Sequence, residues 1–131
     1  MKQNMIQFVE RYFVFSDGRG AIEGLINFGK WQELNYIFSD KGTIRGNHYH
    51  KSTKEAFIIL SGRINVTLQK VLNGKFVGKK KKYTVIKGQV FVIEPLVNHV
   101  FHVEDPAEWL NLLSCKIDQK IPDIFRVQTN I

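Results

Sequence analysis

Apolar residues occur along this chain in short runs that are rich in β-branched and aromatic side chains, and glycines separate the runs. No segment keeps the apolar period of about 3.6 residues that marks an amphipathic helix. The pattern predicts strands over residues 11–15, 22–28, 33–39, 56–60, 63–71, 75–86, 90–93, 100–103 and 109–117. Many short strands between turn residues are typical of a β sandwich or barrel, so we expect an all-β fold with little helix.

Three dipeptides mark the turns between these strands. Asn73-Gly74 predicts a type I′ hairpin between 63–71 and 75–86, because both central positions of that turn need a positive φ. Ser61-Gly62 and Lys87-Gly88 predict further turns. We find no linker, repeat or low-complexity segment, and 131 residues suit one domain, so residues 1–131 are predicted to form a single domain.

Composition favours a folded protein outside the membrane. Apolar residues make up 44% of the chain and charged residues 24%, which is typical of a globular domain. No apolar run approaches the ~20 residues of a membrane span. The first residues, MKQNMIQFVERYF, include charged and amide side chains where a signal peptide has an apolar core. We therefore expect a soluble, cytoplasmic protein with no membrane partner.

Charge is distributed unevenly, and the chain has a single cysteine. The net charge is +7, and residues 56–93 carry many lysines but no acidic residue. We interpret this as a solvated hairpin, with a phosphorylated small molecule as an alternative reason for the charge. Nucleic acid is not expected, because no stacking aromatic pattern or helix-turn-helix signal accompanies the lysines. Cys115 follows the apolar run LNLL and is expected to be buried; alone, it excludes an intrachain disulfide.

All four histidines fall in two close pairs, His48 with His50 and His99 with His102. In a strand, residues i and i+2 share a face, so His48 and His50 would present two imidazoles side by side. Glu55 follows a short polar connection and opens an apolar strand, where a carboxylate costs free energy unless it is paired or binds a metal. His99 and His102 have opposite parity, and we expect His99 to face the interior.

These residues predict a metal site. Three imidazoles and one carboxylate can hold a borderline divalent ion such as Zn, Fe, Mn or Ni and leave positions open for water or substrate. The predicted ligands are His48, His50, Glu55 and His99. The alternative is that the histidines make ordinary hydrogen bonds in the core or on the surface.

The spacing around the histidines resembles the two cupin motifs. The first motif is matched at each position, and the second is matched at its glycine, proline and histidine but lacks a third glycine and the closing asparagine. The matching residues are Gly42, His48, His50, Glu55 and Gly62, then Gly88, Pro95 and His99. The resemblance spans about 17–117. It implies a cupin-type jelly roll in which His48, His50, Glu55 and His99 bind a divalent metal.

A narrower resemblance is to the nucleotide-sugar branch of the cupins. It rests on Asp17-Gly-Arg19-Gly20 and on the segment RGNHYHK, which is similar to that of dTDP-sugar 3,4-ketoisomerases. The branch also holds 3,5-epimerases and the cupin domain of capsular-sugar enzymes. It implies a homodimeric isomerase or epimerase that moves a proton beside the ketone of a 4-keto-6-deoxyhexose nucleotide, in surface-polysaccharide biosynthesis. Glu55, where the ketoisomerases tend to have glutamine, favours a metal.

Four polar residues near these motifs are candidates for substrate binding. Arg45 is a plausible anchor for a diphosphate, because its planar guanidinium matches phosphate oxygens. Arg19, Asn47 and Lys51 are the further candidates.

The proton-transfer residue stays open at this point. His48 and His50 can act as acid and base only if they are not metal-bound, because one ring nitrogen cannot do both. His102 or a water would then be the base, whereas Tyr49 should face away from the site. The alternatives to an isomerase are a cupin of another class, such as a dioxygenase or phosphosugar isomerase, and a non-catalytic module that binds a small molecule.

Overall fold

The computed structural model describes residues 4–128, and within this range it contains strands and no helix. The strands are β1 (Ile6–Phe8), β2 (Phe13–Asp17), β3 (Gly20–Gly24), β4 (Glu33–Ser39), β5 (Ile44–His48), β6 (Glu55–Leu72), β7 (Lys75–Ile86), β8 (Val90–Ile93) and β9 (Val97–Leu113). The predicted all-β class is confirmed. Within the described range, no helix is long and apolar enough to cross a membrane.

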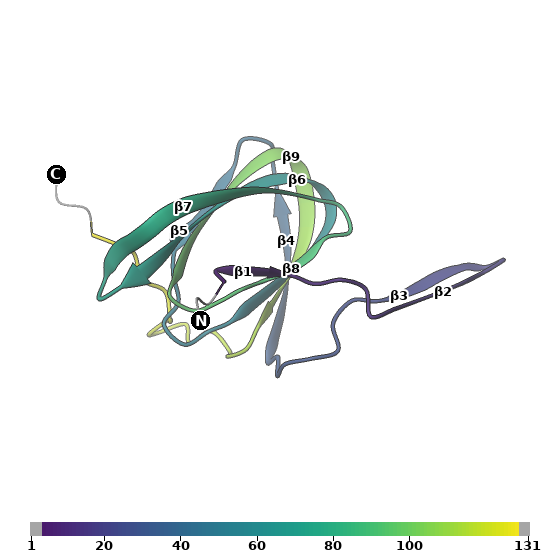
Figure 1. Ribbon diagram of the computed structural model, residues 1–131, viewed down its shortest axis with the longest axis horizontal. Coiled ribbons are helices and arrows are strands. Elements are labelled where there is room, and N and C mark those ends of the chain that lie inside the picture. The colour runs from purple at the N-terminus through teal and green to yellow at the C-terminus, as the bar shows by residue number, and fades with distance from the viewer. Residues whose placement is uncertain (1–3, 129–131) are drawn as a thin grey trace.

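Two long strands, β6 and β9, form the centre of the fold and pair along most of their length (Figure 1). The first half of β6 also pairs with β8, and its second half pairs with β7. Likewise, the second half of β9 pairs with β4 and its first half with β5. Because both strands bend at their middle, one wall of the sandwich has the order β1-β8-β6-β9-β4 and the other contains β7, β6, β9 and β5.

The bend in β6 lies where the sequence predicted a turn. Ser61-Gly62 does not end the strand; instead, the register between β6 and β9 shifts between Ile59 and Ile64. Gly62 has φ +90°, and a Cβ at this position would collide with the Pro106 carbonyl on β9. The glycine therefore serves a bulge that bends one continuous strand, and the predicted separation into two strands is wrong.

Three other strands match the prediction, whereas the predicted strands 100–103 and 109–117 are both parts of the single strand β9, and the strands predicted at 11–15 and 22–28 lie at 13–17 and 20–24. The strands 33–39, 75–86 and 90–93 are confirmed with the same bounds. Asn73 and Gly74 have φ 51° and 76°, as a type I′ turn requires, which confirms the hairpin between β6 and β7. The short strand β1 was not predicted. A strand that carries both His48 and His50 was expected, but β5 ends at His48, so the strand placement of His50 is wrong.

Aromatic side chains fill the space between the walls. Phe57 on β6 stacks against Phe91 on β8 and Trp109 on β9, with ring centroids 5.2 and 5.5 Å apart. Phe101 packs edge-on against Trp109 at 4.8 Å. All four side chains are at most 3% exposed. This cluster forms the floor on which the polar residues described below rest.

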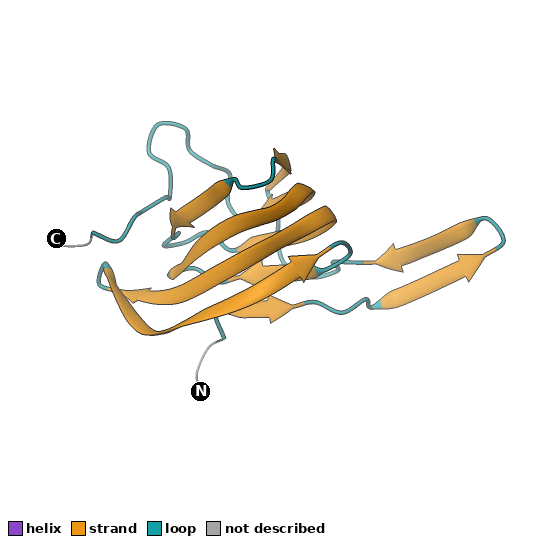
Figure 2. Cartoon of the chain, turned by 90° about the horizontal axis from the view of Figure 1, so that it is seen from above, coloured by secondary structure: helices purple, strands orange, loops and turns teal. Residues whose placement is uncertain are grey.

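The β2–β3 hairpin projects from the sandwich and pairs with no other strand of the described chain (Figures 1 and 2). It nevertheless carries apolar side chains: Val14 is 60% exposed, Phe15 53% and Ile22 61%. A projecting hairpin with this composition leaves apolar surface in water, which marks a contact surface.

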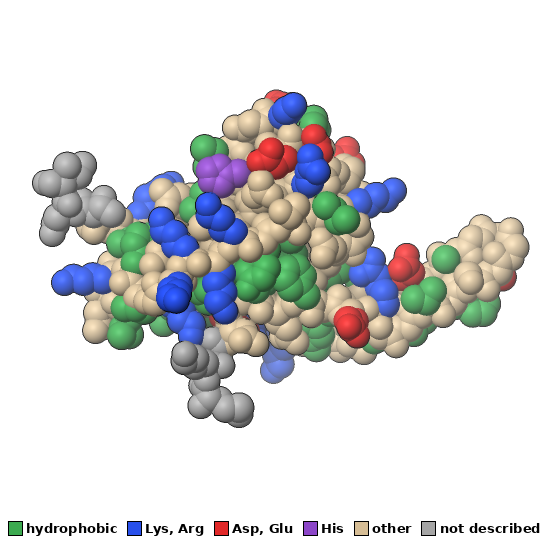
Figure 3. All heavy atoms as spheres, turned by 45° about the horizontal axis from the view of Figure 1, so that its top comes forward, with side chains coloured by type: hydrophobic (Ala, Val, Ile, Leu, Met, Phe, Trp, Pro, Cys, Tyr) green, Lys and Arg blue, Asp and Glu red, His purple; other side chains and the backbone are tan. Residues whose placement is uncertain are grey.

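The lysine-rich segment forms β7, which hydrogen-bonds to β6 on one side only within residues 4–128. Its lysines are exposed, and Figure 3 shows basic side chains gathered on this side of the body. Lysines on a long edge strand oppose pairing with another sheet edge. Cys115 lies beyond the end of β9 and is exposed, so the prediction that it is buried is wrong: the apolar run that precedes it ends with the strand at Leu113.

Candidate functional site

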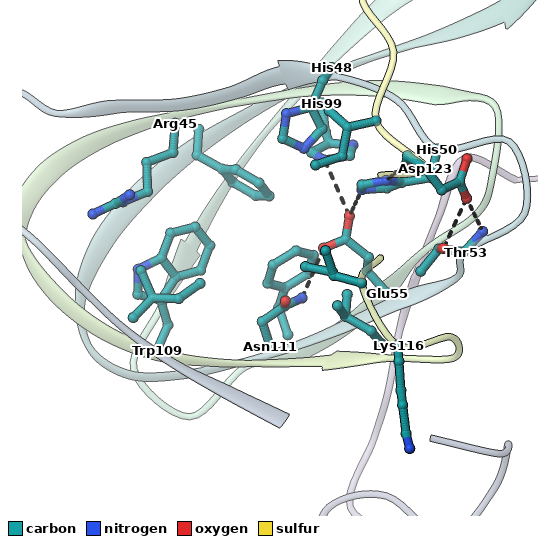
Figure 4. A pocket seen from close by; sticks show the side chains of 16 residues that line it. Arg45, His48, His50, Thr53, Glu55, His99, Trp109, Asn111, Lys116 and Asp123 are labelled. Atoms are coloured by element: carbon teal, nitrogen blue, oxygen red, sulfur yellow. Dashed lines mark hydrogen bonds and ion pairs between the residues drawn. The ribbon is translucent and has the colours of Figure 1, made fainter. Parts of the chain in front are cut away.

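Four side chains from three strands and one loop converge at one end of the sandwich (Figure 4). His48 is the last residue of β5, His50 follows it outside the strand, Glu55 begins β6, and His99 lies near the start of β9. One potential ligand atom from each of the four lies within 4.8 Å of the others. We call this group the histidine–glutamate cluster.

A bulge in β5 brings His48 to the cluster. The register of β5 against β9 shifts between Gly46 and His48, and Asn47 between them has φ 58°. Gly46 has φ +86°, and a Cβ there would lie 2.5 Å from the carbonyl oxygen of His99. Glycine at this position lets the two backbones approach, so that His48 and His99 become direct cross-strand partners.

The rings surround one carboxylate oxygen. The His48 and His99 ring centroids are 4.7 Å apart, and those of His50 and His99 are 5.3 Å apart. Glu55 Oε1 pairs with His50 Nε2 and lies 3.4 Å from His99 Nε2. The other carboxylate oxygen accepts a hydrogen bond of 2.8 Å from Asn111 Nδ2. Glu55 is 6% exposed and His99 is 1% exposed, so these groups face one another away from water.

Backbone carbonyls fix the orientation of two rings. His50 Nδ1 lies 2.5 Å from the Asp123 carbonyl oxygen, and His99 Nδ1 lies 3.1 Å from that of Val97. A carbonyl oxygen can only accept, so each Nδ1 carries the proton and each Nε2 points at Glu55. Histidines that bind metal typically have this arrangement: Nδ1 donates a hydrogen bond to a protein acceptor, and Nε2 is left to bind the ion.

Burial and charge split the histidines into different protonation states. Burial, together with the neighbouring rings of His99 and His50, lowers the pKa of His48 to about 4. Burial also lowers the pKa of His99. For His50, burial alone would lower the pKa, but the negative charge of Glu55 in contact with Nε2 outweighs burial and raises the pKa. Without a metal, these opposed shifts favour the charged form of His50 beside Glu55 and the neutral forms of His48 and His99.

The donor set fits a divalent transition-metal ion. Among the residues that the structure describes, His50 Nε2 and Glu55 Oε1 are buried in ion-pair contact, yet neither makes a hydrogen bond of good geometry. Buried polar atoms of this kind need a partner. Imidazole nitrogens together with one carboxylate oxygen match the ligands that Zn²⁺ and similar ions take in sites with open positions.

A cavity of about 240 Å³ extends from the cluster into the sandwich. Its far end is formed by Arg45 and Trp109, while Phe57 and Phe101 line the apolar part between. Arg45 Nε donates to Ser39 Oγ at 2.6 Å, which fixes the guanidinium on this wall. The cavity thus offers an apolar chamber with a cation at one end and the cluster at the other (Figure 4).

The remaining sequence candidates lie elsewhere. Arg19 is on the projecting hairpin and pairs with Asp17 at 2.6 Å, outside the cavity lining. Lys51 does not line the cavity either; its ammonium lies 4.1 Å from the centroid of the Phe125 ring. Asn47 is exposed beside the bulge, and His102 is exposed on the outer face of β9. On this structure, Arg45 is the substrate-binding candidate that reaches the chamber.

Two kinds of site residue were missed. Asn111 follows Trp109 on the inward face of β9, so strand parity is a signal that could have found it. The second kind comes from the chain beyond β9, where Lys116, Ile117, Asp123 and Ile124 line the cavity. No periodic pattern marks that segment, and only its packing against the sandwich reveals it.

Comparison with known families and structures decides where the chain belongs. The polysaccharide biosynthesis C-terminal domain family matches residues 15–108, which is most of the chain. This chain is a member of that family. The match ends within β9, so the cavity residues beyond Leu113 lie outside it. None of the curated proteins matches the chain in sequence.

Solved structures share the fold of this family member. The sugar 3,4-ketoisomerase QdtA from Thermoanaerobacterium thermosaccharolyticum has a TM-score of 0.70 and 20% identity, covering 93% of this chain and 88% of its own. The WlaRB TDP-quinovose 3,4-ketoisomerase from Campylobacter jejuni gives 0.74 and 22%, covering 92% of each chain. The capsular polysaccharide assembling protein CapF from Staphylococcus aureus gives 0.66 and 20%, covering 89% of this chain and 34% of its own. The predicted cupin-type fold and the predicted likeness to these proteins are confirmed.

Proposed function

We propose that the protein is a nucleotide-sugar isomerase or epimerase that transfers a proton beside the ketone of a 4-keto-6-deoxyhexose nucleotide, in the synthesis of a surface polysaccharide. The observation that carries this proposal is the histidine–glutamate cluster at one end of an apolar chamber. Two structures of QdtA, on the same fold, contain TDP and TDP-4-keto-6-deoxyglucose. A family concerned with polysaccharide biosynthesis supports the same substrate class.

The cluster would hold a divalent metal through His48, His50, Glu55 and His99. Such an ion would supply Lewis-acid stabilisation of negative charge on a substrate oxygen, which is worth several kcal/mol. His48 and His50 are then ligands rather than acid and base. Their assignment as proton carriers applies only to a metal-free enzyme, in which the pKa of about 4 leaves His48 neutral at pH 7 but makes it a weak base.

The rest of the chamber positions the substrate. Phe57, Phe101 and Trp109 give an apolar surface that suits the 6-deoxy carbon and excludes water from the reacting carbons. Arg45 carries a fixed positive charge at the opposite end, where a diphosphate would be paired. This arrangement supports binding of the nucleotide at the Arg45 end with the sugar toward the cluster.

Deuterium incorporation tests the proposed reaction. TDP- and UDP-linked 4-keto-6-deoxysugars are incubated with the protein in deuterated water, and the carbons beside the ketone are followed by NMR. We expect deuterium uptake, and we expect His99→Ala to abolish it because that ring is central to the cluster. Tight binding without uptake across the panel would overturn the reaction and indicate a non-catalytic module. Oxygen consumption with bound iron would indicate a dioxygenase.

We propose further that two copies of the chain form a homodimer through the β2–β3 hairpin. Eight apolar side chains are 44–61% exposed in two neighbouring parts of the chain. Five lie on the hairpin or directly before it, and three lie on the outer face of β4: Tyr12, Phe13, Val14, Phe15 and Ile22, then Leu34, Tyr36 and Phe38. Each half-exposed side chain presents about 100 Å². Alternation along β2 places Phe13, Phe15 and Ile22 on one face of the hairpin and Val14 on the other. That first face and β4 together offer about 600 Å² per partner, at the lower end of stable interfaces. In a twofold dimer, the hairpin of each copy would cover β4 of the other.

Light scattering after gel filtration tests this dimer. Phe15→Asp, on the hairpin face that also carries Phe13 and Ile22, is expected to give a monomer. The matched control is Ile121→Asp, because Ile121 is 81% exposed and belongs neither to the hairpin nor to β4. A wild-type protein that is monomeric at about 50 µM, or a Phe15→Asp variant that stays dimeric, would overturn this interface.

A further inference from the structure

The chain beyond β9 runs back along the site as a strap, which we define as residues 116–126. It lies outside the part of the chain that matches the family. Phe125 forms an isolated antiparallel bridge with Tyr49, and their backbone hydrogen bonds are both 2.9 Å long. Because Tyr49 lies between His48 and His50, the strap is attached to the chain segment that carries two of the cluster's rings.

The strap is fixed most firmly at Asp123. One oxygen of its carboxylate accepts from the Lys51 amide, and the other accepts from the amides of Ser52 and Thr53 and from the Thr53 hydroxyl. All four hydrogen bonds are 2.9 Å long (Figure 4 shows Asp123 facing Thr53). Successive amides that point at one anion form a concave anion-binding site, and here the strap supplies the anion.

The backbone of the same residue acts on His50. The Asp123 carbonyl oxygen lies 2.5 Å from His50 Nδ1. His50 is also the one member of the cluster that lies outside a strand, since His48, Glu55 and His99 belong to β5, β6 and β9. The sheet ladder therefore orients three members of the cluster, whereas His50 depends on the strap.

We propose that Asp123 is a positioning residue for His50: its carboxylate locks the strap onto residues 51–53, and this lock holds its carbonyl oxygen against Nδ1 so that Nε2 faces Glu55. The proposal rests on the proposed function in one respect, namely that the histidine–glutamate cluster is the working site. Releasing the carboxylate frees both the strap and the loop that follows His50. The ring then loses the acceptor that selects its orientation.

Two measurements on the full-length protein test this role. In protein labelled with ¹⁵N-histidine and stripped of metal, NMR reports whether the His50 Nδ1–H proton is protected from exchange with water. Calorimetry reports the affinity for Zn²⁺ alone. The variants are Asp123→Ala, which removes the acceptor, and Asp123→Asn, which keeps one carbonyl oxygen but no charge. The matched control is Asp118→Ala, since the Asp118 carboxylate accepts from the strap's own Lys120 and Ile121 amides.

We expect Asp123→Ala to lose the protected Nδ1–H signal and to bind Zn²⁺ about 10- to 100-fold more weakly, as removal of an outer partner of a metal-binding histidine does. Asp123→Asn should lie between this variant and the wild type, and Asp118→Ala should stay within about twofold of the wild type. If Asp123→Ala fails to fold, Asp123→Asn decides the question.

An unchanged signal and unchanged affinity in the deciding variant would overturn the positioning role. Equal weakening by Asp118→Ala would also overturn it, because the effect would then belong to the strap as a whole. If the wild type binds no Zn²⁺, the metal site of the proposed function fails, while the NMR signal still tests Asp123 separately.

Discussion

Gly46 on β5 lies against the backbone of His99 on β9, so close that a Cβ on the glycine would be 2.5 Å from the His99 carbonyl oxygen. The contact occurs where the register of β5 shifts, one residue pair away from the His48–His99 pair. A small residue therefore controls how near two proposed metal ligands come, although it contributes no ligand atom itself.

Gly46→Ala is expected to destabilise the protein and to weaken metal binding together. The substitution strains a φ of +86° and adds the collision with His99, at a cost of about 1–3 kcal/mol or more in the free energy of unfolding. Urea unfolding and Zn²⁺ calorimetry measure the two effects. Gly74→Ala is the matched control: its φ is +76°, but its Cβ would meet nothing within 4 Å. It should cost stability without changing metal affinity; equal affinity in both variants would contradict the prediction.

Asn111→Leu is expected to destabilise the protein by about 1–3 kcal/mol, because the buried Glu55 Oε2 loses its donor at 2.8 Å. Zn²⁺ affinity should fall as well, since this hydrogen bond orients the carboxylate. Urea unfolding and calorimetry provide the measurements. Asn65→Leu is a suitable comparison, because Asn65 also donates to a glutamate, Glu104, but outside the cavity that holds the cluster. If Asn111→Leu changes neither the free energy of unfolding nor the Zn²⁺ affinity, Glu55 needs no second partner.

The stability of the metal-free protein should be greatest near pH 6.5. Below this pH the unfolded chain protonates His48 and His99, whose folded pKa values are lowered, so it binds more protons and stability falls with falling pH. Above this pH the folded chain still keeps the proton on His50, whose pKa is raised, so stability falls with rising pH. Each proton is worth about 1.4 kcal/mol per pH unit.

Urea unfolding between pH 5 and 8, with a chelator present, measures this dependence. His48→Asn removes one of the two histidines whose pKa is lowered. It should therefore roughly halve the slope of the free energy of unfolding against pH on the acid side. A free energy of unfolding that rises steadily from pH 5 to 8 would contradict the opposite pKa shifts of His50 and of the other two histidines in the cluster.

Removing a bound divalent ion should lower the unfolding temperature. At a free ion concentration 100-fold above the dissociation constant, binding contributes about 2.7 kcal/mol to the folded state. Differential scanning calorimetry with and without a chelator detects the loss. His99→Ala should abolish the difference, whereas His102→Ala should preserve it, because His102 is exposed on the outer face of β9. A chelator effect that survives in His99→Ala would place the ion elsewhere.

The sequence alone determined the class of the fold and the identity of the clustered residues. Alternation and turn residues define strands such as 75–86, because side-chain parity and positive φ are local properties. Clustering of the histidines was visible from spacing, since His48, His50 and Glu55 are close in the chain. The prediction that Cys115 is buried was wrong, because an apolar run does not show where its strand ends.

Only the tertiary structure decided what lies beside the cluster. Asn111 reaches Glu55 and Asp123 reaches His50 from positions more than 50 residues away, and such contacts depend on how β6 and β9 bend and on where the chain returns afterwards. The bend arises at Gly62 from a backbone contact with the opposite strand, so no local pattern distinguishes it from a turn. The packing of the strap likewise depends on the shape of the finished sandwich. Its Asp123 carboxylate accepts hydrogen bonds from the amides of residues 51–53, and this loop takes its shape only once β5 and β6 are in place.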